Sequence, residues 1–298
     1  SSRGDYYFLI KEFDNAIADF TKIVELKPKD ASGYRRRADA HCYLKEFESA
    51  IKDFNSAIEL NYKTATVYVD RGWAYYETGN SDQAMSDFTQ AMELDPKNAV
   101  AYNNRGMVYF EKKEMNLAIA DFTKAIEIKS DYVYAYYQRG RSYNNKNQFT
   151  KAIDDFNMVL KIEPKAGEWI YVNRGWAYYK KNMLDEALAD YNNAIEMNPK
   201  PAESYLSRGL VFSEKGELDK AMADYTQAIS INPKYSEAYR SRADVHHLQR
   251  NYKQAIADGE MFIKLAPDDT RVKEMKRIIQ FWKSELKIKG KESSPPPK

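Results

Sequence analysis

Small and aromatic residues recur along the chain three or four residues apart, in short blocks separated by polar positions. Within residues 68–98, one block contains Tyr68, Gly72 and Tyr75, and a second contains Ala84 and Phe88. This spacing keeps the residues on one face of an α-helix. The stretch therefore predicts two short helices, each with one face turned towards a core.

The two-helix pattern repeats with a fixed period. Sliding the sequence against itself by 34 residues superposes a series of arginines, and one single-residue slip extends the series towards the carboxy terminus. A fixed period of this length is typical of a repeat array, in which each repeat packs against its neighbours instead of entering one globular core. The superposed residues are Arg37, Arg71, Arg105, Arg139, Arg174, Arg208 and Arg242.

When Ala65 is taken as position 1 of a 34-residue repeat, the recurring residues fall at fixed positions. They are Tyr68 at position 4, Gly72 at 8, Tyr75 at 11, Ala84 at 20, Phe88 at 24, Ala91 at 27 and Pro96 at 32. This spacing resembles the tetratricopeptide repeat, with Tyr in place of its usual Trp and Arg in place of its usual Leu. The resemblance implies an all-α, right-handed superhelical solenoid of antiparallel helix pairs whose concave face binds partner segments. It implies no chemistry.

The repeat register divides the chain into segments. We expect a partial repeat at residues 1–30, and we expect the parent protein to continue before Ser1. A capping helix at 270–289 and a disordered tail at 290–298 should follow the last repeat. The repeat at 133–167 is one residue longer than the others, near Gly167. The seven full repeats are 31–64, 65–98, 99–132, 133–167, 168–201, 202–235 and 236–269.

Turn-forming residues mark the ends of the expected helices. The first helix of a repeat should end near position 15, where several copies have Gly79, Asn147, Asn182 and Gly216. The second helix should begin behind a capping side chain, namely Asp82, Asn116, Thr150, Asp185 or Asp219. Proline should close it, at Pro96, Pro164, Pro199, Pro233 and Pro267.

The charge and cysteine content narrow the partner classes. A net charge of +2 argues against nucleic acid, and no apolar run is long enough for direct membrane insertion. The segment from Arg271 onward is basic and amphipathic, which suits a membrane or partner anchor, although we favour a solvated outer face. The single Cys42 fits a cytoplasmic or a periplasmic or secretory compartment, and the oligomeric state stays open.

No constellation of catalytic, cofactor-binding or metal-binding residues emerges. His246 and His247 are adjacent and point about 100° apart on a helix, which is poor metal geometry. No glycine motif cradles a phosphate, and Cys42 has no partner base nearby. We therefore expect no catalytic residue, no cofactor and no metal in a protein that is not an enzyme.

One series of charges lies on the core-facing side. Every copy has Arg at position 7 and Asp at position 23, beginning with Arg3 and Asp19. A charge at a core-facing position has to be compensated. We expect a structural stack of Arg–Asp pairs, in which Arg105 bonds Asp121 of its own repeat or Asp87 of the preceding one.

The opposite face of the first helices holds residues that solvation alone does not explain. A rotation of about 100° per residue puts positions 2, 5, 6, 9, 12 and 13 on this face. Position 6 carries side chains that can hydrogen-bond a peptide group, in Asp70, Asn104, Gln138 and Asn173. Around them lie Trp73, Tyr76, Phe110, Tyr134, Tyr137, Arg141, Trp169, Trp176 and Tyr179. Such aromatic clusters are typical of binding surfaces, unless they pack against one another or form a dimer contact.

We therefore predict a non-enzymatic scaffold that binds an extended protein or peptide segment in a concave groove. The alternatives are a substrate-delivery repeat domain of a larger enzyme or of a secretion or envelope component, and a glycan-binding surface. Clamping of an acidic carboxy-terminal tail is not expected, because Gln138 follows Asn104 and because Tyr134 and Trp169 replace the lysines of family members that do this.

Overall fold

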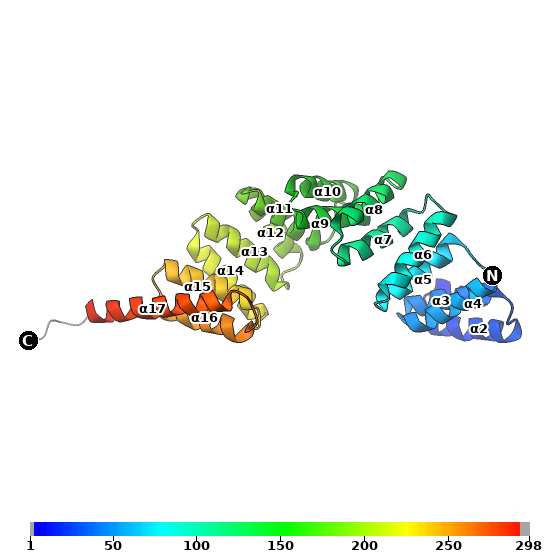
Figure 1. The fold of residues 1–298 in the computed structure, drawn as a ribbon, viewed down its shortest axis with the longest axis horizontal. Helices are drawn as coiled ribbons and strands as arrows, with labels where there is room; N and C mark the ends of the chain where they lie inside the picture. The colour runs from blue at the N-terminus through cyan, green and yellow to red at the C-terminus, as the bar shows by residue number, and fades with distance from the viewer. Residues whose placement is uncertain (1–2, 293–298) are drawn as a thin grey trace, which may run out of the picture. The chain divides into compact units, whose positions relative to one another are not determined.

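The computed structural model describes residues 3–292, and within that range it contains seventeen α-helices and no strand. The chain forms two compact units, unit 1 (Ser1–Ile162) and unit 2 (Glu163–Lys298), coloured blue to green and green to red in Figure 1. The division falls at the start of the connection that contains Gly167, where the sequence analysis placed the extra residue. The predicted all-α fold with a carboxy-terminal capping helix is confirmed.

The helices follow one another with short connections. Unit 1 contains α1 (Arg3–Leu9), α2 (Phe13–Leu26), α3 (Ala31–Tyr43), α4 (Phe47–Glu59), α5 (Ala65–Glu77), α6 (Ser81–Leu94), α7 (Ala99–Glu111), α8 (Met115–Ile128), α9 (Val133–Asn145) and α10 (Phe149–Ile162). Unit 2 contains α11 (Glu168–Lys180), α12 (Leu184–Met197), α13 (Ala202–Glu214), α14 (Leu218–Ile231), α15 (Ser236–Leu248), α16 (Tyr252–Leu265) and α17 (Val272–Glu292).

Within each unit, every helix packs against the helices before and after it, and the first helices of adjacent repeats also touch. The core of a repeat is built on an aromatic ring against a glycine. Phe122 is fully buried, and a Cβ atom added to Gly106 would lie 2.7 Å from its Cε1 atom. Ala101 and Val108, at positions 3 and 10, are also fully buried, although the sequence analysis assigned these positions to neither face. The reason is that α7 packs against both α6 and α8.

The expected Arg–Asp pairs all form, and each joins the two helices of one repeat. The Arg105 Nε and Nη2 atoms donate to the two Asp121 carboxylate oxygens, both at 2.8 Å. The same two-point contact occurs in all eight copies at distances between 2.5 and 2.9 Å. Of the two alternatives for Arg105, the partner in its own repeat is therefore correct.

Six of the arginines also reach back to the preceding repeat, a contact that was not predicted from the sequence: Arg37, Arg71, Arg105, Arg139, Arg208 and Arg242. The Arg71 Nη1 atom donates to the Asn55 Oδ1 atom at 2.7 Å, and Arg139 donates to the Thr123 hydroxyl at 3.1 Å. The tyrosines at positions 4 and 11, expected to be core, are mostly half-buried because they flank the guanidinium groups. The Tyr68 ring centroid, for instance, lies 5.5 Å from the Arg71 guanidinium carbon. The arginines thus connect neighbouring repeats as well as paired helices.

The helix ends agree with the sequence only in part. The residues expected in left-handed geometry have positive φ, from 57° at Asn147 to 78° at Gly79, and the expected prolines follow the second helices. The expected caps are wrong, because the second helices start earlier and Asp82 lies inside α6. The Asp82 carboxylate instead accepts a hydrogen bond from the Lys112 ammonium of the next repeat at 2.8 Å. Three more residues at this position likewise accept a hydrogen bond from the following repeat, namely Asn116, Asp185 and Asp219.

The capping helix α17 covers the last repeat with the apolar side of its amphipathic sequence. Trp282 is 1% exposed, and Met275 and Ile279 are also buried. Gly259 stands where other repeats have an aromatic ring, and a Cβ atom there would lie 3.1 Å from Ile279. The helix extends to Glu292, beyond the expected end at residue 289, and residues 293–298 of the expected tail lie outside the described residues.

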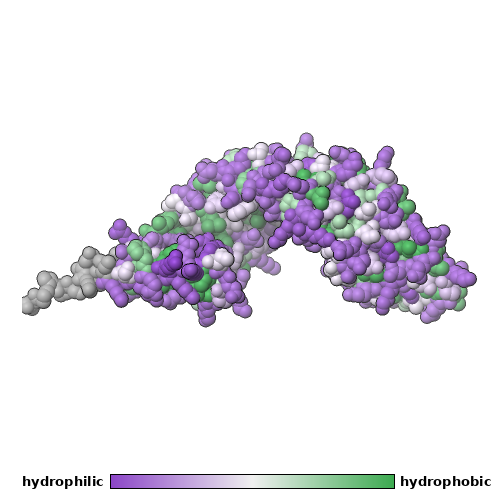
Figure 2. Space-filling view, viewed as in Figure 1, coloured by the Kyte–Doolittle hydropathy of each residue, from purple (hydrophilic) through white to green (hydrophobic). Residues whose placement is uncertain are grey.

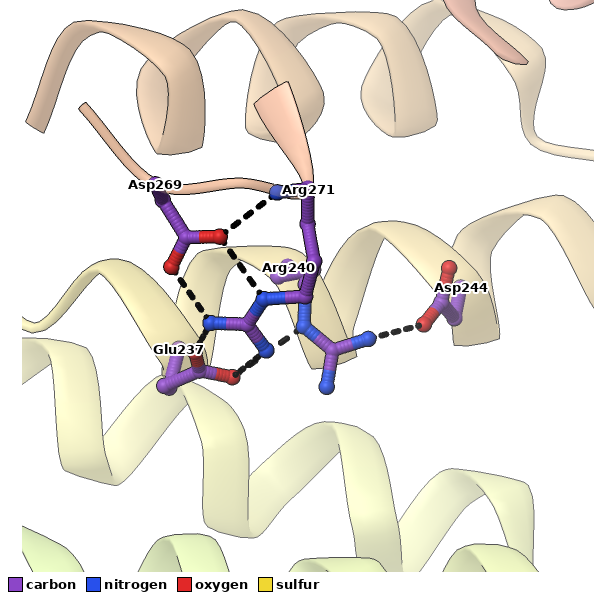
Figure 3. Close-up of polar contacts among 5 residues, drawn as sticks. All are labelled: Glu237, Arg240, Asp244, Asp269 and Arg271. Carbon is purple, nitrogen blue, oxygen red and sulfur yellow. Dashed lines mark hydrogen bonds and ion pairs between the residues drawn. The ribbon is translucent and has the colours of Figure 1, made fainter. Parts of the chain in front are cut away.

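A group of ion pairs fixes the start of α17 (Figure 3). The Arg271 guanidinium contacts Asp269 on its own segment and Glu237 on α15. These hydrogen bonds hold the pKa of Asp269 down at about 2. Arg240 completes the group with contacts to Glu237 at 3.1 Å and to Asp244 at 3.4 Å. The capping helix is therefore tied to the last repeat by charge as well as by its apolar side.

Polar side chains cover most of the visible surface of both units in Figure 2. Among residues 3–292, no helix is long and apolar enough to cross a membrane.

Candidate functional site

The predicted binding residues occupy positions 2, 5, 6, 9 and 12 of the first helices, and the side of these helices that holds them is here called the inner face. In unit 1 an open cavity of about 800 Å³ lies on this face, between α1, α3, α5 and α7. Asp70, Trp73 and Asn104 line it, as the sequence analysis proposed for a binding surface. The remaining lining residues are Phe8, Asp39, Cys42, Tyr43, Lys45, Phe47, Val69, Glu77 and Val100.

Negative charge is concentrated in this cavity, which we call the acidic cavity after its three carboxylates Asp39, Asp70 and Glu77. Burial raises the pKa of Asp70 to about 7, and the nearby Asp39 carboxylate adds to the shift. Burial likewise raises the pKa of Asp39 to about 6, against the opposing influence of Arg35, whose guanidinium lies 3.0 Å away. Two close carboxylates thus lie in a partly desolvated space.

The Cys42 thiol belongs to the same cavity. Burial raises its pKa to about 12, and Asp70 and Asp39 contribute to the shift. A thiol with so high a pKa stays protonated at neutral pH, and a protonated thiol is a weak nucleophile. The arrangement therefore suits Cys42 as a packing residue of the cavity wall.

The wall of the acidic cavity also presents an amide group. The Asn104 side chain is only 8% exposed, and its Oδ1 atom accepts a hydrogen bond from Asn103 at 3.2 Å. Its Nδ2 group has no hydrogen-bond partner within residues 3–292. This N–H group is not fully buried and Asn104 lines the cavity, so the amide is available to donate to a group that enters it.

Further along unit 1, α7 and α9 bring three of the predicted residues around a fourth, the cation Arg141. The Arg141 guanidinium carbon lies 4.7 Å from the Phe110 ring centroid and 5.5 Å from that of Tyr137. Arg141 also donates to the Gln138 Oε1 atom at 3.1 Å. The hydrogen bond to Gln138 uses one of the five N–H groups of the guanidinium, and the two rings restrict its orientation.

Two other aromatic residues of unit 1 differ in their surroundings. Tyr76 packs beside Trp73, with ring centroids 5.2 Å apart, and its hydroxyl donates to the Glu111 carboxylate of α7. Tyr134, by contrast, is 65% exposed. Tyr76 therefore helps to hold the inner face together, whereas Tyr134 stands in solvent.

In unit 2, the predicted residues all lie on α11. The Trp176 and Tyr179 rings are 5.7 Å apart, and Trp176 is 39% exposed. Asn173 is not simply displayed, because its Nδ2 group donates to the Trp169 carbonyl of its own helix at 2.8 Å. The amide can release this bond only by rotating, so its expected role in gripping a peptide is weakened.

Gly167 acts differently from its expected role in absorbing an irregular turn. Its φ of −66° and ψ of 167° are ordinary extended values, which any residue adopts. The place of its missing Cβ atom is taken by the Trp169 indole ring. Glycine is therefore needed for the close approach of Trp169, one of the predicted site residues.

Some lining residues escaped the sequence analysis. Four of them occupy positions assigned to the inner face, where only aromatic residues, position-6 residues and Arg141 were singled out from the sequence: Asp39, Val69, Glu77 and Val100. The charge of Asp39 and Asp70 on successive first helices was the available signal. Within residues 3–292 no group of three potential ligands could hold a metal ion.

The fold and the inner face define a helical-repeat scaffold of the kind that mediates protein interactions. Profiles described as tetratricopeptide repeat match residues 99–132, 133–166 and 169–201, and a further one matches 2–30. A profile described as TPR repeat matches residues 72–113 and 211–249. These matches extend over more than half of the chain, so it belongs to the tetratricopeptide repeat family.

Solved structures with the same fold are numerous, whereas no curated protein matches the chain. YrrB, a TPR protein with an unusual peptide-binding site, is 24% identical over 64% of this chain and 97% of its own, with a TM-score of 0.52. MamA is 25% identical over 55% of this chain and 96% of its own, with a TM-score of 0.52. A tetratricopeptide repeat protein from Parabacteroides merdae is 18% identical over 84% and 98%, with a TM-score of 0.64.

Proposed function

We propose that this protein binds an extended segment of a partner protein along the inner face of its first helices. The observation that carries the proposal is the acidic cavity of unit 1, where Trp73, Asp70 and the Asn104 amide meet. Aromatic side chains in a recess supply most of the affinity of many interfaces, and polar groups beside them fix the orientation. YrrB shares this fold, and a peptide-binding site is attributed to it.

The repeat spacing suits a segment in extended conformation. Packed helices lie about 8–10 Å apart, whereas an extended chain advances about 3.3 Å per residue. One first helix therefore meets about every third residue of the segment. Asn104 would donate to a peptide carbonyl group, and Trp73 would bury a side chain of the segment.

A second group of contacts would lie on α7 and α9. Arg141 is held by Phe110 and Tyr137, so its guanidinium loses little freedom on binding an acidic side chain. In unit 2, a separate contact surface on α11 would be formed by Trp169, Asn173, Trp176 and Tyr179. The same aromatic and amide groups would suit a glycan, and a glycan array probed beside a peptide array separates the two ligands.

The test is capture of peptides by the full chain. We expect an array of random nonapeptides to be bound by the wild type and to lose most of its signal when Trp73, Asn104 and Arg141 are all changed to Ala. Leu117→Ala is the matched control, because Leu117 is exposed on the second helix α8. Unchanged peptide binding by the folded triple variant, judged by far-ultraviolet circular dichroism, would contradict the proposal.

A further inference from the structure

The acidic cavity contrasts with the charge balance of the chain. The full sequence has a net charge of +2, whereas the cavity lining contains three carboxylates and one cation, Lys45. Asp39 is paired with Arg35, which is not among the lining residues. Asp70 and Glu77 have no hydrogen bond or ion pair within residues 3–292. The cavity therefore has a negative charge that its own surroundings leave partly uncompensated.

We infer that the acidic cavity receives a basic side chain, Lys or Arg, from the segment bound on the inner face, with Asp70 as its principal partner. This inference rests on the proposed function and specifies the chemistry of the segment. An ammonium or guanidinium group is the counterpart that charge complementarity requires for a pair of close carboxylates.

The apolar wall of the cavity suits the stem of such a side chain. Val69 and Val100 lie beside Asp70 in the lining, together with the Trp73 ring. Lys and Arg bury their methylene groups against apolar surface while the charged end reaches a polar partner. The Trp73 indole can also attract the cation through its π-face. A small inorganic cation would make no use of these groups.

The Asn104 amide indicates that the basic group arrives on a polypeptide. Its Nδ2 group is a donor and cannot bind a cation, but it can bind a peptide carbonyl group. The cavity thus presents acceptors for a basic side chain and a donor for the backbone that bears it. These two requirements are met together by one residue of an extended segment.

The ionisation of the carboxylates agrees with this assignment. Burial and the neighbouring Asp39 raise the pKa of Asp70 to about 7, so ionising both carboxyl groups is costly when no cation is bound between them. A bound cation would favour the ionised form of both carboxyl groups. Binding should therefore be accompanied by proton release near neutral pH, and Arg35, Lys45, Glu77 and the Cys42 thiol are the other titratable groups around the pair.

The test is selection from an immobilised random nonapeptide array with the full chain at pH 8. We expect bound peptides to be enriched in Lys or Arg at one position, and replacement of that residue by norleucine should weaken binding at least about tenfold. Asp70→Asn should lose this discrimination while still binding the norleucine peptide. Asp82→Asn is the matched control, because Asp82 is 90% exposed on a second helix.

The outcomes separate this inference from the proposed function. Peptide binding without enrichment of basic residues, or full retention of the preference by Asp70→Asn, would overturn the inference alone. If the wild type binds no peptide, the proposed function fails and the inference with it. Asp70→Lys provides a second variant, and it should shift the preference towards Asp or Glu at the same position.

Discussion

Replacing Asp121 with Asn in the third full repeat tests how much the Arg–Asp stack contributes to stability. Asn keeps the size and one oxygen acceptor, but it removes the charge and one of the two hydrogen bonds from Arg105. The Asp121 side chain is only 9% exposed, and that of Arg105 is 22% exposed. The substitution therefore leaves a half-buried guanidinium group without its counter-charge.

The expected magnitude follows from the two exposures. Removing one partner of a fully buried ion pair costs roughly 3–5 kcal/mol. Arg105 is partly hydrated, and it keeps its contacts with the Thr89 hydroxyl at 3.4 Å and with the Tyr109 ring at 5.7 Å. We therefore expect Asp121→Asn to lower the free energy of unfolding by about 2–3 kcal/mol, somewhat less than for a fully buried pair.

The assay is urea denaturation followed by far-ultraviolet circular dichroism at pH 7. A weakened central repeat in a linear array also lowers cooperativity, so the transition should broaden or split as well as shift. Asp82→Asn is the control, since it removes the same charge from an exposed pair with Lys112 and should change little. If Asp121→Asn leaves the transition as unchanged as the control does, the stack has no stabilising role.

Three further predictions concern the core, the acidic cavity and the cap. Gly106→Ala should lower the free energy of unfolding by about 1–3 kcal/mol, measured by urea denaturation, because the new methyl group overlaps the fully buried Phe122 ring. The pKa of Asp70 rises from an ordinary 3.8 to about 7 on folding, so its ionisation lowers stability as pH increases across that range. Asp70→Asn should therefore raise the free energy of unfolding at pH 8 by up to about 4 kcal/mol, measured by urea denaturation. At pH 4 it should leave the free energy of unfolding unchanged. The folded-state pKa of Asp269 is lowered to about 2, so its contribution is present above pH 4 and is lost as pH falls to 2. Stability measured by thermal melting should therefore be lower in Arg271→Gln than in the wild type at pH 7, and the two should converge as the pH falls to 2.

The repeated part of the fold could be predicted in detail because the same pattern of core and charged positions recurs in eight copies. A pair such as Arg105 and Asp121 has one physical explanation at every copy, namely that a core-facing charge needs compensation. The face calculation also placed Asp70, Trp73 and Asn104 on one surface, and the structure brings all three to the same cavity. Their role in binding stays a prediction.

What the sequence did not predict depends on contacts between different helices. Asp82 is of a residue type that often caps helices, yet α6 begins one residue before it, and its carboxylate accepts a hydrogen bond from Lys112 of the next repeat. Asn173 has an amide that could bind a peptide, yet it donates a hydrogen bond to the Trp169 carbonyl of its own helix. Asp39 was not singled out from the sequence, because only packing of α3 against α5 places it near Asp70. In each case the residue type was clear and the partner was not.

The internal repeats also indicate where specificity can reside. Positions 7 and 23 hold Arg and Asp in all eight copies because they join paired helices, whereas inner-face positions are free of this requirement. Position 9, for example, carries Asp39, Trp73 and Arg141 in three repeats of unit 1. Residues that change from copy to copy on an otherwise constant framework are available for recognition of a particular partner.

This variation gives unit 1 a direction. The carboxylates without an ion pair, Asp70 and Glu77, lie on α5, whereas the ring-held guanidinium of Arg141 lies on α9, two repeats further along. A segment with one basic and one acidic residue can satisfy both charges in only one orientation, and reversing it would place like charges together. Charge order along the first helices would thus select the direction of the bound chain, while Trp73 and the rings around Arg141 supply apolar contact at both ends.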